Sequence, residues 1–270
     1  MTKISTGAIT THVQRLDAVR PPEEMGEAPV VVFVHGLLTD SLASYYFTLG
    51  PAFAAAGIDV IMYDLRGHGR SDRPASGYRV ENFVDDLVGL LDALGEKRPV
   101  HVVGNSFGGT VAAGLSAWHP ERVATVTLIE SEPPVPVWTE HISVGLASAK
   151  RQLVRDEAID WIRDNHGAHT ARLSRGASRI LESTTLAEEV AAGRTIDADL
   201  SALTRPMLAI FGDESGLSDQ KSYLEANVPA EIRVVVLPEQ GHSVLVERTE
   251  ETRDLVLDWV LRHTLAEAVR

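Results

Sequence analysis

The chain has 270 residues, of which 44% are hydrophobic and 23% charged, and these proportions exclude a disordered tail, a collagen-like rod and a short disulfide scaffold. It contains no cysteine, which rules out thiolate nucleophiles, iron–sulfur clusters and cysteine-bound zinc. The formal net charge of −13 repels phosphate backbones, so we expect no nucleic-acid partner.

The start of the chain lacks the apolar core of a signal peptide. The most hydrophobic stretch, residues 30–34, is too short to span a bilayer. We therefore expect a cytoplasmic protein that does not act at a membrane.

Short apolar runs alternate with helical stretches, which is typical of βαβ units around a mostly parallel sheet. Residues 8–16 form a weaker run, which indicates an antiparallel edge strand. We expect buried strands at residues 29–34, 58–63, 99–103, 123–129, 207–211 and 232–237. We expect helices at residues 42–56, 80–94, 106–118, 217–227 and 249–265.

One connection breaks this alternation, because more than seventy residues separate the fourth of these buried strands from the fifth. Prolines interrupt regular structure at its entrance, and beyond them apolar residues such as Val154 and Trp161 recur at helical spacing. A loop of this length without secondary structure would be improbable. We expect a helical lid over one end of the sheet at residues 133–203, and a core formed by residues 1–132 and 204–270.

Residues 150–179, within the predicted lid, are locally basic, with seven Lys or Arg side chains against four carboxylates. A solvated helical face accounts for such a run, and docking of an anionic substrate or an acidic partner is the alternative. His166 and His169 lie three residues apart in the same stretch, but no carboxylate motif accompanies them, so we expect no metal site. We also expect no cofactor.

Residues 104–109 read Gly-Asn-Ser-Phe-Gly-Gly between a predicted strand and a predicted helix, and they match the pattern Gly-x-Ser-x-Gly. A sharp strand-to-helix turn strains its corner residue, and the flanking glycines let the two segments approach each other. Ser106 would then point into solvent as a nucleophile, while the N–H of Phe107 at the helix N-terminus could stabilise an oxyanion. The glycine patterns of dinucleotide and phosphate loops are not matched.

Four motifs together resemble the α/β-hydrolase fold over nearly the whole chain: residues 33–37 (Phe-Val-His-Gly-Leu), 64–72 (Asp-Leu-Arg-Gly-His-Gly-Arg-Ser-Asp), 104–109 and 240–243 (Gln-Gly-His-Ser). The resemblance implies a mostly parallel central sheet flanked by helices. It also implies that Leu37 supplies a second oxyanion N–H and that His242 is the general base. Within the second motif, we expect Arg66, His68 and Asp72 to be structural and to pair with one another.

The acid that would orient the base has several candidates. The commonest arrangement in the family places an aspartate at position 215, which is a serine here. A second arrangement, familiar in lactonase-like members, uses a glutamate after the preceding strand, which favours Glu130. Glu132, Asp213 and Asp219 are the alternatives.

The substrate is expected to lie between Ser106 and the lid, with Leu38 and Trp138 as apolar walls. Such a pocket suits a medium-sized hydrophobic acyl compound. The sequence therefore predicts a serine hydrolase that cleaves a carboxylic ester, a lactone or a thioester through an acyl-enzyme. The bond type and the oligomeric state stay open.

Two other functions are alternatives on the same scaffold. Residues 104–109 resemble carbon–carbon bond hydrolases of ring-cleavage diketones, although the chain lacks their glycine-rich oxyanion loop and their aspartate at position 215. A non-hydrolytic cyclase or a ligand-binding receptor is disfavoured by the intact Ser–His pair. Haloalkane dehalogenases and epoxide hydrolases would need an aspartate where Ser106 stands.

Overall fold

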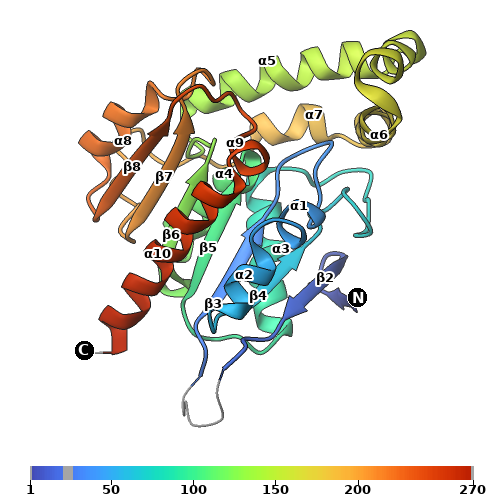
Figure 1. The fold of residues 1–270 in the computed structure, drawn as a ribbon. Helices are drawn as coiled ribbons and strands as arrows, with labels where there is room; N and C mark the ends of the chain where they lie inside the picture. Colours follow the sequence, from blue (N-terminus) through green and yellow to red (C-terminus); the bar gives the residue numbers. More distant parts are fainter. Residues whose placement is uncertain (1, 21–26, 269–270) are drawn as a thin grey trace.

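The computed structural model describes residues 2–20 and 27–268, which contain an eight-stranded sheet in the order β1-β2-β4-β3-β5-β6-β7-β8 (Figure 1). The pairs β1–β2 and β2–β4 are antiparallel, and all others are parallel, which confirms the mostly parallel sheet. The strands are Thr2–Ser5 (β1), Thr10–Leu16 (β2), Val30–Val34 (β3), Asp59–Tyr63 (β4), Val100–Asn105 (β5), Val123–Ile129 (β6), Met207–Gly212 (β7) and Ile232–Leu237 (β8).

The six predicted buried strands are confirmed as β3 to β8, but the prediction of an edge strand at residues 8–16 is wrong in one respect. The strand β2 does run antiparallel, yet it lies between β1 and β4 rather than at the edge. The strand at this edge of the sheet is β1, which is almost entirely exposed, so it has no apolar face that the sequence pattern could show.

Helices cover both faces of the sheet (Figure 1). One face carries α3 (Val80–Ala93), α4 (Phe107–Trp118) and α8 (Gln220–Asn227), and the other carries α1 (Ala43–Tyr46), α2 (Gly50–Ala55), α9 (Val244–Glu247) and α10 (Thr249–Ala268). The single helix expected at residues 42–56 is wrong, because the chain forms α1 and α2 with a turn between them. Pro51 stands in the first turn of α2, where its missing N–H costs nothing, and this favours a new helix start.

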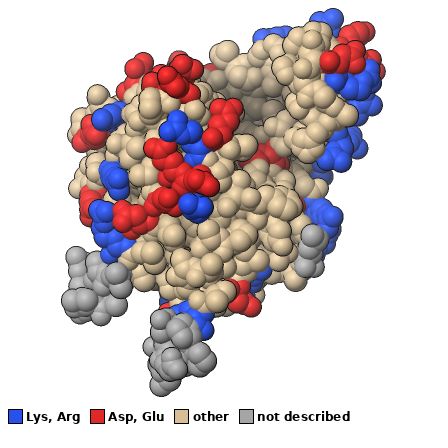
Figure 2. Space-filling view, viewed as in Figure 1, with Lys and Arg blue, Asp and Glu red and all other residues tan. Residues whose placement is uncertain are grey.

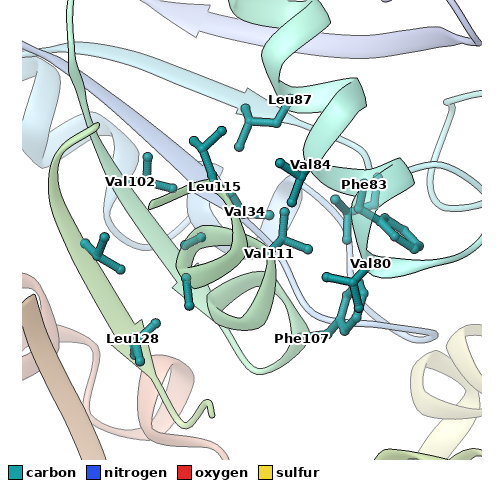
Figure 3. Packing of buried hydrophobic residues seen from close by; sticks show 14 of the residues in the cluster. Val34, Val80, Phe83, Val84, Leu87, Val102, Phe107, Val111, Leu115 and Leu128 are labelled. Carbon is teal, nitrogen blue, oxygen red and sulfur yellow. The ribbon is translucent and has the colours of Figure 1, made fainter. Parts of the chain in front are cut away.

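Side chains that alternate along the buried strands pack into two separate hydrophobic cores, one on each face of the sheet. In β3, Val32 and Val34 belong to the core under α3 and α4, whereas Val31 and Phe33 face α1, α2 and α10. In the first core, apolar side chains of α3 point toward those of α4, which pack against the sheet; the labelled residues include Val84, Leu87, Val111 and Leu115 (Figure 3). Two covered faces explain why these strands are continuously apolar.

Three helices occupy the long connection between β6 and β7: α5 (Pro136–Leu153), α6 (Asp156–Ser183) and α7 (Leu186–Glu189). They lie beyond the carboxyl ends of the parallel strands (Figure 1). Trp161, singled out by its helical spacing, is 59% exposed, whereas Trp138 and Ile180 join the core cluster. Gly167 interrupts α6 with φ 85° and ψ 164°. In the described parts of the chain, no helix combines the length and apolarity needed to cross a membrane.

The second motif is structural, but its expected internal pairing is mostly wrong. Arg66 donates from Nε and Nη2 to the two carboxylate oxygens of Asp86 in α3, each at 2.7 Å, and both side chains are buried. Asp72 accepts the backbone N–H of Thr10 at 2.9 Å. Of these three side chains, only that of His68 bonds within the motif, through Nδ1 to the backbone carbonyl of Arg66 at 2.8 Å. No sequence pattern points to Asp86, because this partner lies on a different element.

Removal of Asp86 leaves the Arg66 guanidinium buried without its carboxylate. We expect Asp86→Ala to lower the free energy of unfolding by about 3–5 kcal/mol, the usual cost of removing one partner of a buried ion pair. Asp85→Ala, the same change at the adjacent exposed position of α3, should cost less than about 0.5 kcal/mol. Urea unfolding measures both values, and equal losses would contradict a structural role for this ion pair.

Candidate active site

Ser106 stands at a strained corner between β5 and α4, with φ 52° and ψ −126°. A Cβ added to Gly104 would lie 2.2 Å from the backbone carbon of Gly108, and one added to Gly108 would lie 2.0 Å from the carbonyl oxygen of Val34. No side chain fits at either position. Gly104 is therefore required for β5 to meet α4, and Gly108 is required for α4 to meet the end of β3. The surrounding packing therefore holds Ser106 in a backbone conformation that it would not adopt alone.

The structure brings together three of the residues singled out by sequence. His242, in the loop after β8, places Nε2 3.1 Å from Ser106 Oγ and Nδ1 3.1 Å from Glu130 Oε2. The other oxygen of Glu130 accepts the backbone N–H of Gly212 at the end of β7. With its proton on Nδ1, the imidazole donates to Glu130 and can accept the hydroxyl proton of Ser106.

The other acid candidates do not contact His242. Glu132 faces His141 of α5, with Oε2 3.6 Å from Nδ1. Asp213 accepts the backbone N–H of Gln240 at 3.3 Å, and Asp219 is exposed at the start of α8. Ser215, at the position usually held by an aspartate, bonds the Gly212 carbonyl at 3.0 Å and receives the N–H of Leu217 at 3.1 Å. Its hydroxyl therefore only closes the local turn.

Two backbone N–H groups are candidates to hold an oxyanion. Phe107 is the first residue of α4, where the helix leaves its N–H unbonded. Within the described residues, the N–H of Leu37 has no acceptor either. The preceding residue, Gly36, lies against the nucleophile, since a Cβ there would meet Ser106 Cβ at 3.3 Å. The ring of Phe107 packs on Phe83 of the core with centroids 4.9 Å apart (Figure 3), which fixes the start of the helix.

Two buried histidines brace the loop that carries Leu37. His35 Nε2 accepts the N–H of Leu65 at 3.0 Å, and its Nδ1 donates to the Gly36 carbonyl at 2.6 Å. His68 Nε2 accepts the N–H of Leu38 at 2.8 Å and so holds this residue at φ 66°. Burial, reinforced by the neighbouring His35, lowers the pKa of His68 from 6.5 to about 3. A neutral His68 keeps its Nε2 lone pair free to hold the loop.

A cavity of about 300 Å³ opens beside Ser106, between the core and α5. Trp138 lines it as predicted, with its ring stacked on Phe107 at a centroid distance of 6.3 Å. Leu38 instead lines a separate cavity. Sequence reasoning missed His141 and Ile142 of the wall, although they follow Trp138 at the spacing of one helix face. The complete lining is Ser106, Phe107, Thr110, Glu130, Ser131, Glu132, Trp138, His141, Ile142, Ser215, Leu217 and His242.

Two further findings delimit the site. A larger cavity of about 780 Å³ lies around α9 and α10, but it is a wide groove lined mainly by charged side chains and lies away from Ser106. In residues 2–20 and 27–268, no group of three or more His, Cys, Asp or Glu side chains is arranged to hold a metal ion.

Comparisons with known proteins identify the family to which this fold belongs. A family model described as the alpha/beta hydrolase fold matches residues 29–164. 2-Hydroxymuconate semialdehyde hydrolase of Pseudomonas sp. (strain CF600) is 31% identical over 224 residues, which cover 74% of this chain and 76% of that protein. Non-heme chloroperoxidase of Streptomyces lividans is 37% identical, but over only 35% of this chain and 34% of its own length.

A solved structure extends the similarity over nearly the whole chain. Est816, described as an N-acyl homoserine lactone degrading enzyme, superposes with a TM-score of 0.68 and 25% sequence identity. The superposition covers 94% of this chain and 98% of that one.

The buried, neutral state of His68 makes stability depend on pH. The pKa of His68 is near 6.5 in the unfolded chain and about 3 in the folded protein. Between these pH values only the unfolded state binds the proton, so lowering the pH destabilises the folded state. This contribution changes by about 1.4 kcal/mol per pH unit. We expect the stability of the wild type relative to His68→Gln to fall with that slope from pH 6.5 to 4.5.

Denaturant unfolding at several pH values measures this difference. Subtraction of the variant removes the contributions of other titrating groups, including His101, whose pKa burial lowers to about 4. A difference that does not change with pH would show that His68 is not kept neutral by the fold.

Proposed function

The chain belongs to the α/β-hydrolase family, and we propose that it acts as a serine hydrolase that cleaves a carboxylic ester, a lactone or a thioester through an acyl-enzyme. The observation that carries this proposal is the series of two contacts that links Ser106 to His242 and His242 to Glu130. The proposed substrate is a medium-sized hydrophobic acyl compound, in keeping with the apolar walls that Trp138 and Ile142 provide.

In the first step, Ser106 Oγ attacks the carbonyl carbon of the substrate while His242 Nε2 takes the hydroxyl proton. The imidazolium is stabilised by the carboxylate of Glu130, which is buried against the end of β7. The carbonyl oxygen becomes an oxyanion, and the N–H groups of Phe107 and Leu37 are the donors proposed to hold it.

Collapse of this tetrahedral intermediate breaks the bond to the leaving oxygen or sulfur atom, which receives the proton from His242. Water then attacks the acyl-enzyme by the same route, with His242 again acting as base, and releases the carboxylic acid. In each half-reaction His242 accepts one proton and donates it again, first from Ser106 to the leaving atom and then from water to Ser106. The reaction therefore consumes only water.

We propose that residues 133–203 act as the lid of this site. Support comes from α5, because Trp138, His141 and Ile142 line the same cavity as Ser106. These helices then determine which acyl groups fit, while the core supplies the groups that react. The similarity to Est816 favours a lactone among the possible substrates.

Carbon–carbon bond hydrolysis is the second candidate, and the similarity to 2-hydroxymuconate semialdehyde hydrolase favours it. Residues 104–109 also resemble enzymes of that class. Ser215 argues against carbon–carbon bond hydrolysis, because those enzymes carry an aspartate at this position. Here the Ser215 hydroxyl bonds only to backbone groups of its own turn.

The nucleophile is tested first. We expect Ser106→Ala to lower kcat/KM for p-nitrophenyl butyrate by at least about 10³-fold, because the reacting groups act as a unit. Ser116→Ala, the same substitution at a buried position further along α4, should retain most of the activity. Covalent labelling by a fluorophosphonate should appear in the wild type and in Ser116→Ala only. Retention of a tenth of the activity by Ser106→Ala would exclude the proposed nucleophile.

The acid is tested by two matched substitutions. Glu130→Gln keeps the side-chain shape but removes the charge that stabilises the imidazolium, so we expect kcat/KM to fall by at least about 10²-fold. Asp213→Asn, which changes a carboxylate that does not contact His242, should cost less than about tenfold. Melting curves should show that both variants are folded. A severe loss in Asp213→Asn with a mild one in Glu130→Gln would reverse the assignment.

A further inference from the structure

Near Ser106 there is a second cavity besides the one that Trp138 lines. It has a volume of about 340 Å³ and adjoins the loop that carries the proposed oxyanion donor Leu37. Three segments form it: residues 38–41, the turn that contains Gly69 and Arg73, and the stretch of α6 from Arg172 to Ile180. It therefore lies between the core and the inserted helices, on the side of the loop at which Leu38 is found. None of its lining residues belongs to the cavity that Trp138 lines.

The wall of this second cavity is rich in guanidinium groups, from Arg73, Arg172 and Arg179. Each uses one nitrogen in a local contact: Arg73 Nε lies 3.0 Å from a backbone carbonyl, Arg172 Nη2 lies 3.2 Å from a histidine nitrogen, and Arg179 Nε lies 3.3 Å from a backbone carbonyl. Across the described part of the chain, none of the three pairs with a carboxylate. Each guanidinium therefore keeps several N–H donors for another acceptor.

Asp40 is the only carboxylate among the described residues that line this cavity, and its oxygens are already used within the loop. They accept the backbone N–H groups of Gly36 and Ser41, each at 2.8 Å, and the hydroxyl of Ser44. The wall thus retains an excess of positive charge in a chain whose net charge is −13. Figure 2 shows Lys and Arg gathered along the inserted helices, whereas Asp and Glu dominate the face around α9 and α10.

The cavity wall also reaches the nucleophile. A Cβ placed on Gly36 would lie 3.3 Å from Asp40 Oδ2 and 3.3 Å from Ser106 Cβ, so these two residues flank the same point. Because Asp40 lines the cavity, the cavity wall lies close to Ser106, with Gly36 between them. This short separation favours an anionic group of the substrate itself over the remote phosphates of a long carrier.

We propose that this second cavity binds a carboxylate of the substrate, so that the natural substrate is an ester, lactone or thioester that also carries a free carboxylate. Guanidinium groups bind carboxylates through paired N–H donors, and the three arginines offer such donors from two sides of the cavity. The inference rests on the proposed function, because it names a substrate class for the same nucleophile. It also gives part of the basic stretch at residues 150–179 a specific task.

The test compares pairs of esters in which one member carries a free carboxylate and the other is neutral. Monoethyl adipate against diethyl adipate places the carboxylate on the acyl side, and 4-carboxyphenyl butyrate against phenyl butyrate places it on the alcohol side. The measured quantity is the ratio of kcat/KM for the anionic ester to that for the neutral ester. Each pair of esters is one arm of the test. If the ratio is higher in the wild type than in a variant without the arginines, that arm shows on which side of the scissile bond the natural substrate carries its carboxylate.

The double variant Arg172→Gln/Arg179→Gln should lower this ratio by at least about tenfold in one arm, because two charged donors are lost. Arg175→Gln is the matched control, since Arg175 is exposed on the same helix but does not line the cavity. It should leave the ratio within about twofold of the wild type. Added salt should lower the ratio in the wild type and in the control.

A binding measurement makes the result independent of turnover. Adipate should raise the melting temperature of the wild type and of Arg175→Gln, but not that of the double variant, and neutral 1,6-hexanediol should raise none of them. If adipate also fails to raise the melting temperature of Arg175→Gln, the effect comes from the overall positive charge of the helix. That result would contradict a specific carboxylate site.

The two proposals fail in different ways. If the wild type hydrolyses neutral esters and the double variant keeps the same ratios in both arms, the carboxylate site is wrong and the serine hydrolase stands. If no ester is hydrolysed and Ser106 is not labelled, the proposed function is wrong, and adipate binding then decides the carboxylate site alone.

Discussion

Close backbone contact between the strand that precedes Ser106 and the helix that follows it governs the geometry of the site. The contact is possible only because position 104 lacks a side chain, and Gly108 likewise lets the helix lie against the end of β3. Ser106, at the corner between strand and helix, has a positive φ. Glu130, at the end of the neighbouring strand, has φ 49° as well. Such conformations cost on the order of 1–3 kcal/mol each, and the two buried cores of the sheet stabilise them. Both side chains consequently meet His242 from rigid positions.

The site divides into two regions of opposite character around the nucleophile. Trp138 and Ile142 provide apolar walls on one side, in a cavity where the carboxylate of Glu132 faces the imidazole of His141. On the other side, beyond Leu38, the wall is cationic. A bound molecule with one apolar end and one charged end has a single favourable orientation in such a site, because the reverse orientation would bury a charge against tryptophan.

The parts of the fold that follow from local chemistry could be predicted from the sequence. Continuous apolar runs located six strands, and the glycine spacing around Ser106 located the turn. The family arrangement pointed to Glu130, which does face His242. Features that depend on distant partners could not be predicted. Asp86 lies on another element from Arg66, and Leu38 owes its conformation to His68.

The break in α6 at Gly167 divides that helix into two parts with separate roles. Beyond the break lie Arg172 and Arg179, whereas the part before it carries Trp161 and lines neither of the two cavities near Ser106. A Cβ at Gly167 would meet nothing within 4 Å, so only the backbone conformation demands glycine. A fluorophore or a peptide attached to the part of α6 before Gly167 would therefore lie outside both cavities.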